Sequence, residues 1–113
     1  MHEMALAESM LEIVEETARR NGASRVTAVC LELGALAHVE VDALRFCFDA
    51  VARGGIANAA RLTIVATEGQ AWCMPCGTSV PLAHRGEPCP RCGSYQLEVT
   101  QGEAMRLKEV EIA

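Results

Sequence analysis

Cys73-Met74-Pro75-Cys76 and Cys89-Pro90-Arg91-Cys92 are two Cys-x-x-Cys pairs with twelve residues between them. Each pair places two sulfur atoms on one tight turn, and a glycine follows each pair, at Gly77 and Gly93. Glycine permits the sharp turn that aims backbone N–H groups at the thiolates. Two such turns facing each other form a tetrahedral cage of four sulfurs, the ligand set of structural zinc sites. The spacing therefore predicts zinc bound by Cys73, Cys76, Cys89 and Cys92, with disulfides or free thiols as the alternative.

The composition of the chain changes near residue 70. From Gln70 to Tyr95 the sequence is rich in proline, glycine and cysteine and has little periodic apolar pattern. Such a piece buries too little apolar surface to fold alone, so a metal would supply its core. We expect residues 70–100 to form a zinc-ribbon domain, inserted before a last strand that returns to the main domain at residues 1–69 plus about 101–113.

The totals limit the class of protein. The chain has 113 residues and a formal net charge of −5, and half of its residues are hydrophobic. It has no continuous apolar run of membrane-spanning length and no signal-peptide pattern, so we expect a cytoplasmic protein with reduced cysteines. Bound zinc would make the charge more negative by about −2. This acidity, without any basic cluster, disfavours nucleic acid as a partner.

Hydrophobic periodicity predicts an α+β fold. Two helices are expected at residues 4–21 and 41–53, the first with Ile13 on its buried stripe. Alternating patterns predict strands at 25–33, 61–67 and 96–100, and a last strand near 105–112 with a slip near Lys108. Cys30 and Cys47 stand alone on a strand and a helix, which is typical of small core residues.

The first three residues, Met1-His2-Glu3, have a specific coordination chemistry if the amino terminus is free. The terminal amine, the amide nitrogen of His2 and its imidazole can chelate one cation in fused rings. Deprotonated amide nitrogens suit square-planar Ni(II) or Cu(II). The simpler alternative is an exposed histidine at a helix start, where Glu3 complements the positive end of the helix dipole.

The chain resembles the HypA/HybF family, the nickel metallochaperones of [NiFe]-hydrogenase maturation, essentially from end to end. The likeness rests on Met1-His2-Glu3, on Leu33-Gly34 leading into Leu44-Arg45-Phe46, on the two Cys-x-x-Cys pairs and on the closing stretch Thr100-Gln101-Gly102-Glu103-Ala104-Met105-Arg106-Leu107. It implies an α+β protein in which two helices on a three-stranded sheet carry nickel and a zinc ribbon is inserted.

The resemblance also implies the site residues. Nickel would be bound by the amine of Met1, the amide and imidazole of His2 and the amide of Glu3. A carboxylate near the second helix has been linked to nickel in some members, and here that position is Glu40. His38 could line the nickel approach, and His84 could exchange into the zinc shell or respond to pH. The four cysteines match the zinc ligands.

The resemblance implies metal binding and transfer, so no enzymatic activity is expected. The implied partners are a GTPase of the HypB type and the hydrogenase large-subunit precursor, with urease as a further recipient and a homodimer as one open state. Two rivals remain at this stage: a zinc-ribbon module that contacts protein or nucleic acid, and a rubredoxin-like iron protein. Four thiolates leave no open position for a hydrolytic zinc enzyme, and neither pair opens a helix as in thiol oxidoreductases.

Overall fold

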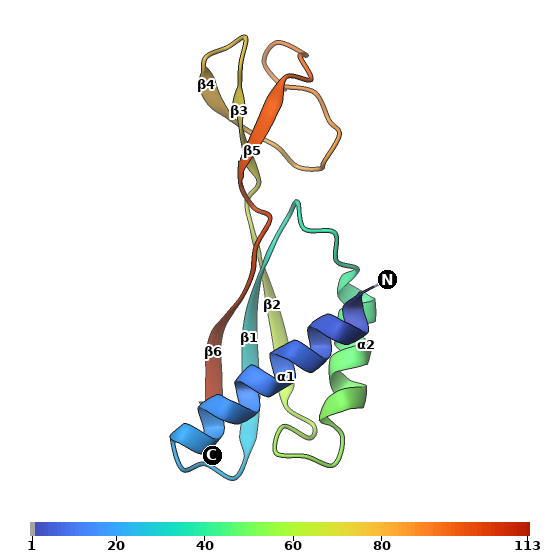
Figure 1. Cartoon of the computed structure of the whole chain (residues 1–113), viewed down its shortest axis with the longest axis vertical. Coiled ribbons are helices and arrows are strands. Elements are labelled where there is room, and N and C mark those ends of the chain that lie inside the picture. The colour runs from blue at the N-terminus through green and yellow to red at the C-terminus, as the bar shows by residue number, and fades with distance from the viewer. Residues whose placement is uncertain (1) are drawn as a thin grey trace. The chain divides into compact units, whose positions relative to one another are not determined.

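The computed structural model describes residues 2–113 (Figure 1). The elements in chain order are α1 (Glu3–Arg20), β1 (Val26–Gly34), α2 (Val41–Ala52), β2 (Arg61–Thr67), β3 (Gln70–Cys73), β4 (Thr78–Pro81), β5 (Leu97–Gln101) and β6 (Met105–Ile112). They form two compact units: residues 1–31, 38–64 and 107–113 in the first, and 32–37 and 65–106 in the second. The predicted α+β class, with two helices and a cysteine-bearing sheet, is confirmed.

The first unit is built on the two helices, which pack against each other. The buried residues of α1 recur at helical spacing: Ala7, Met10, Val14 and Ala18. The prediction for Ile13 was wrong, because this residue is 54% exposed and lies one position from Val14 on the solvent side. On α2 the buried positions are Leu44, Phe48 and Ala52. These apolar stripes supply the core of the unit together with buried residues of β1.

A three-stranded sheet has the strand order β2-β1-β6. It contains the strands predicted at 25–33, 61–67 and 105–112, although the sequence predicted no order for them. The central strand β1 has buried residues at both odd and even positions, whereas every residue of the outer strand β2 is half-buried or exposed. Along β6 the half-buried positions are Met105, Leu107 and Val110, so the parity changes around Lys108. Side chains of a strand alternate between faces, and the change of parity lies where the sequence predicts a slip.

The second unit contains a smaller sheet with the order β4-β3-β5. Both neighbours of β3 are antiparallel to it. Sequence periodicity missed β3 and β4, since each has only four residues. Leu36, Ala71 and Leu82 form a buried cluster against which Leu97 and Val99 pack. The unit therefore has an apolar core of its own, besides the sulfurs.

Three glycines of the second unit bring three stretches of backbone into direct contact. A Cβ on Gly34 would lie 2.0 Å from the carbonyl oxygen of Gly102, and one on Gly102 would lie 2.6 Å from the Cα of Gly69. Hydrogen bonds join the same stretches, with Gly34 N–H donating to Ala104 and Leu36 N–H donating to Gly102. The glycines in the Leu33-Gly34 and Gln101-Gly102 motifs are therefore explained by packing.

Within residues 2–113, neither helix combines the length and the apolar composition that crossing a bilayer requires.

Candidate metal centres

The four cysteines of the two Cys-x-x-Cys pairs meet in the second unit. Their sulfur atoms all lie within 4.8 Å of one another. Cys73 Sγ lies 3.5 Å from Cys92 Sγ, and Cys76 Sγ lies 4.0 Å from Cys89 Sγ. A tetrahedral zinc ion with Zn–S bonds of about 2.3 Å requires sulfurs about 3.8 Å apart. All four are free thiols, and these separations far exceed a disulfide bond of about 2.05 Å. The cluster fits zinc.

The two turns that carry these cysteines have the same construction. Gly77 N–H donates to the carbonyl of Cys73 and Gly93 N–H donates to the carbonyl of Cys89, at 2.8 and 2.9 Å. Both glycines have positive φ angles, 63° and 75°, which a residue with a side chain adopts only at a cost. The N–H of Arg91 lies 3.4 Å from Cys89 Sγ, and the N–H of Cys92 also acts on this sulfur. The predicted role of the glycines is confirmed for the turns, while the thiolate donors come from within the second pair.

The surroundings of the thiols separate their acidities. Burial raises the pKa of Cys73, and the neighbouring thiols of Cys92 and Cys73 raise the pKa of Cys76 to about 12. Burial would also raise the pKa of Cys89, but the backbone N–H groups of Cys92 and Arg91 outweigh it and lower that pKa to about 6. The metal-free cluster thus holds a thiolate readily at Cys89 and keeps protons on Cys73 and Cys76. A divalent cation would have to displace those protons.

The remaining cysteines and His84 lie apart from this cluster. Among the described residues, the metal-ligand grouping comprises the four sulfurs alone. Cys30 and Cys47 are half-buried on β1 and α2. The loop residue His84 is exposed, and its backbone N–H donates to Glu87 Oε1 at 3.3 Å.

The start of α1 forms a second candidate site. Met1, whose amine is a predicted nickel ligand, lies outside the described residues. His2 is the exposed N-cap of α1, and its side chain makes no capping hydrogen bond. The first helical hydrogen bond runs from Leu6 N–H to the carbonyl of His2. The amides of Glu3, Met4 and Ala5 therefore have no partner within the helix. The imidazole of His2 thus makes no capping bond, and the amide nitrogen of Glu3 lies ahead of the helical hydrogen bonds.

The side chain of Glu3 has a role that the sequence did not reveal. It is only 4% exposed, and its Oε2 accepts a hydrogen bond from the backbone N–H of Glu40 at 3.1 Å. Its Oε1 is buried without a protein partner among the described residues. The Glu40 N–H is the largest cause of a lowered pKa for the Glu3 carboxyl. The only sequence signal was an acidic residue at a helix start, which usually stays in solvent.

This contact brings residue 40 to the beginning of α1. Glu40 is the N-cap of α2, where its Oε1 accepts a hydrogen bond from Asp42 N–H at 3.3 Å. This cap engages only one oxygen of the carboxylate in the contacts of residues 2–113, so Oε2 can bind a metal while the cap is kept. His38 is exposed two residues earlier, in the segment that leads to α2.

A small α+β protein whose four cysteine sulfurs gather in one ligand cluster belongs to the metal-binding class. The sequence profile described as "Hydrogenase/urease nickel incorporation, metallochaperone, hypA" matches residues 1–112. The chain belongs to this family. The match favours a nickel metallochaperone of hydrogenase maturation over a zinc-ribbon interaction module.

Similar proteins cover the whole chain. A hydrogenase maturation factor HypA of Rhodopseudomonas palustris strain BisB5 is 60% identical over 112 residues, 99% of both chains. One from Azotobacter chroococcum is 53% identical over the same share. The solution structure of the Ni metallochaperone HypA from Helicobacter pylori has the same fold, with a TM-score of 0.70, 24% identity and coverage of 99% of this chain and 97% of that one. A second solution structure of a HypA protein has the same TM-score at 27% identity and covers 100% and 97% of the two chains.

Proposed function

We propose that this metallochaperone binds one Ni(II) at its amino terminus, through the amine of Met1, the amide and imidazole of His2 and the amide of Glu3. The start of α1 is the observation that carries the proposal. The His2 side chain makes no capping bond there, and the Glu3 amide lies ahead of the first helical hydrogen bond. Nickel can therefore take up these nitrogens without breaking the helix. Backbone nitrogen donors in a square plane suit Ni(II).

Exposure of the proposed site suits transfer. His2 is exposed, so a recipient protein can approach the metal from solvent. Protons compete with nickel for the imidazole and for the amide nitrogens, so acid favours release. The proposed steps are the binding of Ni(II) and its transfer to a recipient protein, and neither step makes or breaks a covalent bond of a substrate. We therefore assign no enzymatic activity to the chain.

Glu40 is proposed as an additional carboxylate at the nickel site. The Glu3–Glu40 hydrogen bond supports its location, and the cap of α2 uses Oε1, which leaves Oε2 for the metal. Glu40→Gln separates the two roles, because the amide oxygen can still accept from Asp42 N–H while the charge is lost. We expect weaker nickel binding with an unchanged melting temperature. Unchanged nickel affinity would remove Glu40 from the site.

We propose that Cys73, Cys76, Cys89 and Cys92 hold a structural zinc ion in the second unit. Sulfur separations of 3.5 and 4.0 Å and the two glycine turns support this assignment. Four thiolates would saturate the ion, so it would contribute to folding and not to chemistry. The corresponding domain division, nickel at 1–69 plus about 101–113 and zinc at 70–100, is part of the proposal.

The partners follow from family membership. We propose that a GTPase of the HypB type and the precursor of a hydrogenase large subunit exchange nickel with this chain in the cytoplasm. Urease maturation is proposed as a second use of the same nickel.

The decisive experiment is metal analysis of zinc-loaded protein with a native amino terminus, incubated with nickel and desalted. A matched sample carries a peptide tag before Met1, which converts the terminal amine into an amide. We expect about one zinc in both samples and about one nickel in the untagged sample alone. Equal nickel in both samples would contradict the amino-terminal site.

A further inference from the structure

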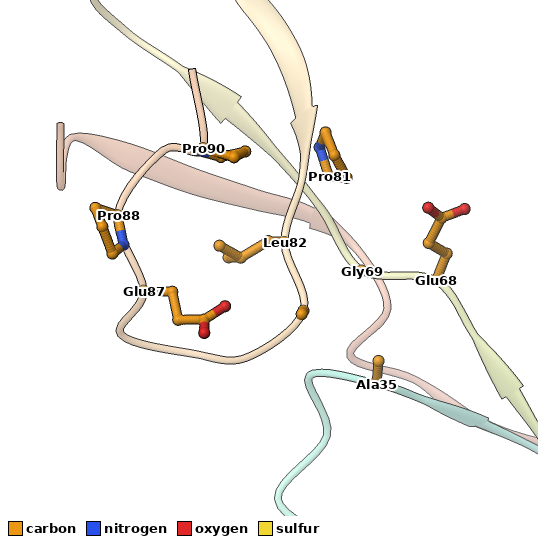
Figure 2. Close-up of a pocket in the computed structure, with 9 residues that line it drawn as sticks. Ala35, Glu68, Gly69, Pro81, Leu82, Glu87, Pro88 and Pro90 are labelled. Atoms are coloured by element: carbon orange, nitrogen blue, oxygen red, sulfur yellow. The ribbon is translucent and has the colours of Figure 1, made fainter. Parts of the chain in front are cut away.

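The second unit contains a pocket of about 460 Å³ (Figure 2). It lies between the end of β4 and the loop that leads to Cys89, and every lining residue belongs to this unit. Small-ligand and side-chain pockets in proteins typically measure about 300–1,000 Å³. The pocket is therefore large enough to take one or two side chains. None of the four cysteines lines it, although Pro88 and Pro90 flank Cys89.

The walls of the pocket are apolar and nearly without hydrogen-bond donors. Three prolines line it, Pro81, Pro88 and Pro90, and Leu82 projects between them (Figure 2). Proline has no backbone N–H. The N–H of Leu82 is already donated to the carbonyl of Gly69 at 2.9 Å. The interior therefore favours an apolar group and offers little to a polar one.

The lining also carries negative charge that has no ion-pair partner among residues 2–113. Glu68 and Glu87 both line the pocket and both are exposed. Within residues 2–113, neither carboxylate forms an ion pair, whereas nearby Glu103 is paired with Arg85. In the described part of the chain, the Glu87 carboxylate accepts one hydrogen bond, from the backbone N–H of His84 at 3.3 Å. An occupant with a positive charge next to its apolar group would complement this lining.

An end strand adjoins the pocket. β4 pairs with β3 on one side and is the outer strand of the order β4-β3-β5, and its last residue, Pro81, lines the pocket. The free edge of an outer strand presents unpaired backbone groups that an extended peptide can use. A peptide can therefore be held by backbone hydrogen bonds to this edge while its side chains enter the pocket. A small amine without a peptide backbone cannot form these edge hydrogen bonds.

Several contacts fix the shape of the pocket before anything binds. Arg85 Nε donates to the carbonyl of Leu36 at 2.8 Å, and this arginine is also paired with Glu103. Gly69 has no room for a Cβ, which would lie 2.3 Å from the carbonyl oxygen of Leu82. The loop then ends at the buried Cys89, whose N–H donates to Ser94. A site shaped in advance loses less entropy on binding.

We propose that this pocket is a docking site for an extended peptide segment of a partner protein, with one large apolar side chain between the prolines and an adjacent lysine or arginine at Glu68 and Glu87. The site uses residues of the second unit alone. It goes beyond nickel binding and does not depend on it.

The test uses full-length, zinc-loaded, isotope-labelled protein and the synthetic peptide acetyl-Thr-Lys-Leu-Arg-Val-amide as the probe. We expect saturable amide shifts at residues 79–90 and 68–69. A matched peptide with glutamate in place of lysine and arginine should bind at least about fivefold more weakly, the effect of losing two exposed ion pairs of ordinary strength. A peptide with serine in place of leucine should also bind at least about fivefold more weakly, because it loses the apolar group that the pocket buries.

Protein variants complete the test. Glu68→Gln combined with Glu87→Gln should weaken binding about fivefold, while Glu98→Gln, an exposed carboxylate on β5 outside the pocket, should leave it unchanged. Zinc content verifies that each variant is folded. The proposal would be overturned if no amide shifts appeared at the pocket, or if the acidic peptide bound as tightly as the basic one. A small amine with a branched apolar group, isoamylamine, serves as a further control ligand. If it bound as tightly as the peptide, the pocket would be a small-amine site and not a peptide site.

Discussion

Substitution of Gly34 by alanine tests the account of the glycine contact in the second unit. The added Cβ would lie 2.0 Å from the carbonyl oxygen of Gly102 and 2.9 Å from the backbone nitrogen of Glu103. Ordinary van der Waals contact begins near 3.4 Å, so the backbone would have to move by more than an ångström. The stretches that would move are held by the Gly34–Ala104 and Leu36–Gly102 hydrogen bonds.

The magnitude follows from these contacts. Overpacking of a tight site typically costs about 1–3 kcal/mol. The obstacle here is backbone rather than a flexible side chain, so we place Gly34→Ala at about 3 kcal/mol. At roughly 4 °C per kcal/mol for a chain of this size, the melting temperature should fall by about 12 °C.

Gly54→Ala is the matched control. Gly54 has a φ of +82° but open space around its Cβ position. Alanine there costs about 1–2 kcal/mol for the left-handed conformation, partly offset by the lower entropy of the unfolded chain. We therefore expect a net cost of about 1 kcal/mol and a shift of about 4 °C. Calorimetry of zinc-loaded samples measures both. If Gly34→Ala were no less stable than Gly54→Ala, the packing explanation of the Leu33-Gly34 motif would be refuted.

Three further predictions concern the metal sites. Cys92→Ala should lower the zinc content from about one per chain to below about 0.1 and remove the dispersed amide signals of residues 70–95, because the metal stabilises this region. The control variant Cys47→Ala should retain its zinc. Zinc analysis and NMR spectra measure both effects, and retained zinc in Cys92→Ala would contradict the assignment. His2→Ala should weaken nickel binding more than about 100-fold with zinc unchanged, because loss of even an outer partner costs 10–100-fold; isothermal titration measures it, and an unchanged affinity would sink the amino-terminal site. The Glu40 N–H lowers the pKa of Glu3 below its ordinary 4.5, so the stabilisation it brings is complete above pH 4.5 and is lost as pH falls through the lowered value. Urea midpoints between pH 3 and 6 should accordingly depend less on pH in Glu3→Gln, and parallel curves for the two proteins would show that this carboxylate does not contribute.

Long periodic segments made most of the fold predictable. The helix predicted at 41–53 is observed at Val41–Ala52, and the strand predicted at 61–67 has the same bounds. The four-residue strands β3 and β4 were missed, because a hairpin of this length shows no resolvable alternation and its position is set by the cysteine turns. Ile13 was misplaced because its neighbour Val14 satisfies the same helical spacing, and only packing decides between them.

The two candidate sites differ in how much the sequence could reveal. Cysteine spacing identifies the four sulfurs because the ligands lie on two local turns. The contact between the Glu3 carboxylate and the Glu40 N–H joins residues 37 positions apart and has no local signature. The apolar and acidic residues that line the second-unit pocket are also scattered along the sequence. No local pattern therefore indicates that these prolines and glutamates come together in the folded protein.

The strand order β2-β1-β6 has a consequence for how the chain is made. β1 is synthesised early, yet one of its two partners is β6, the last element, and the Leu36 N–H finds its acceptor only when Gly102 has emerged. The four cysteines of the two Cys-x-x-Cys pairs all precede Gly102 in the sequence. Zinc can therefore be captured by the nascent chain while β1 still has an open edge. Closure of that edge is a late step, since non-local strand pairing is slow, and a chain stalled before β6 would expose β1 to aggregation.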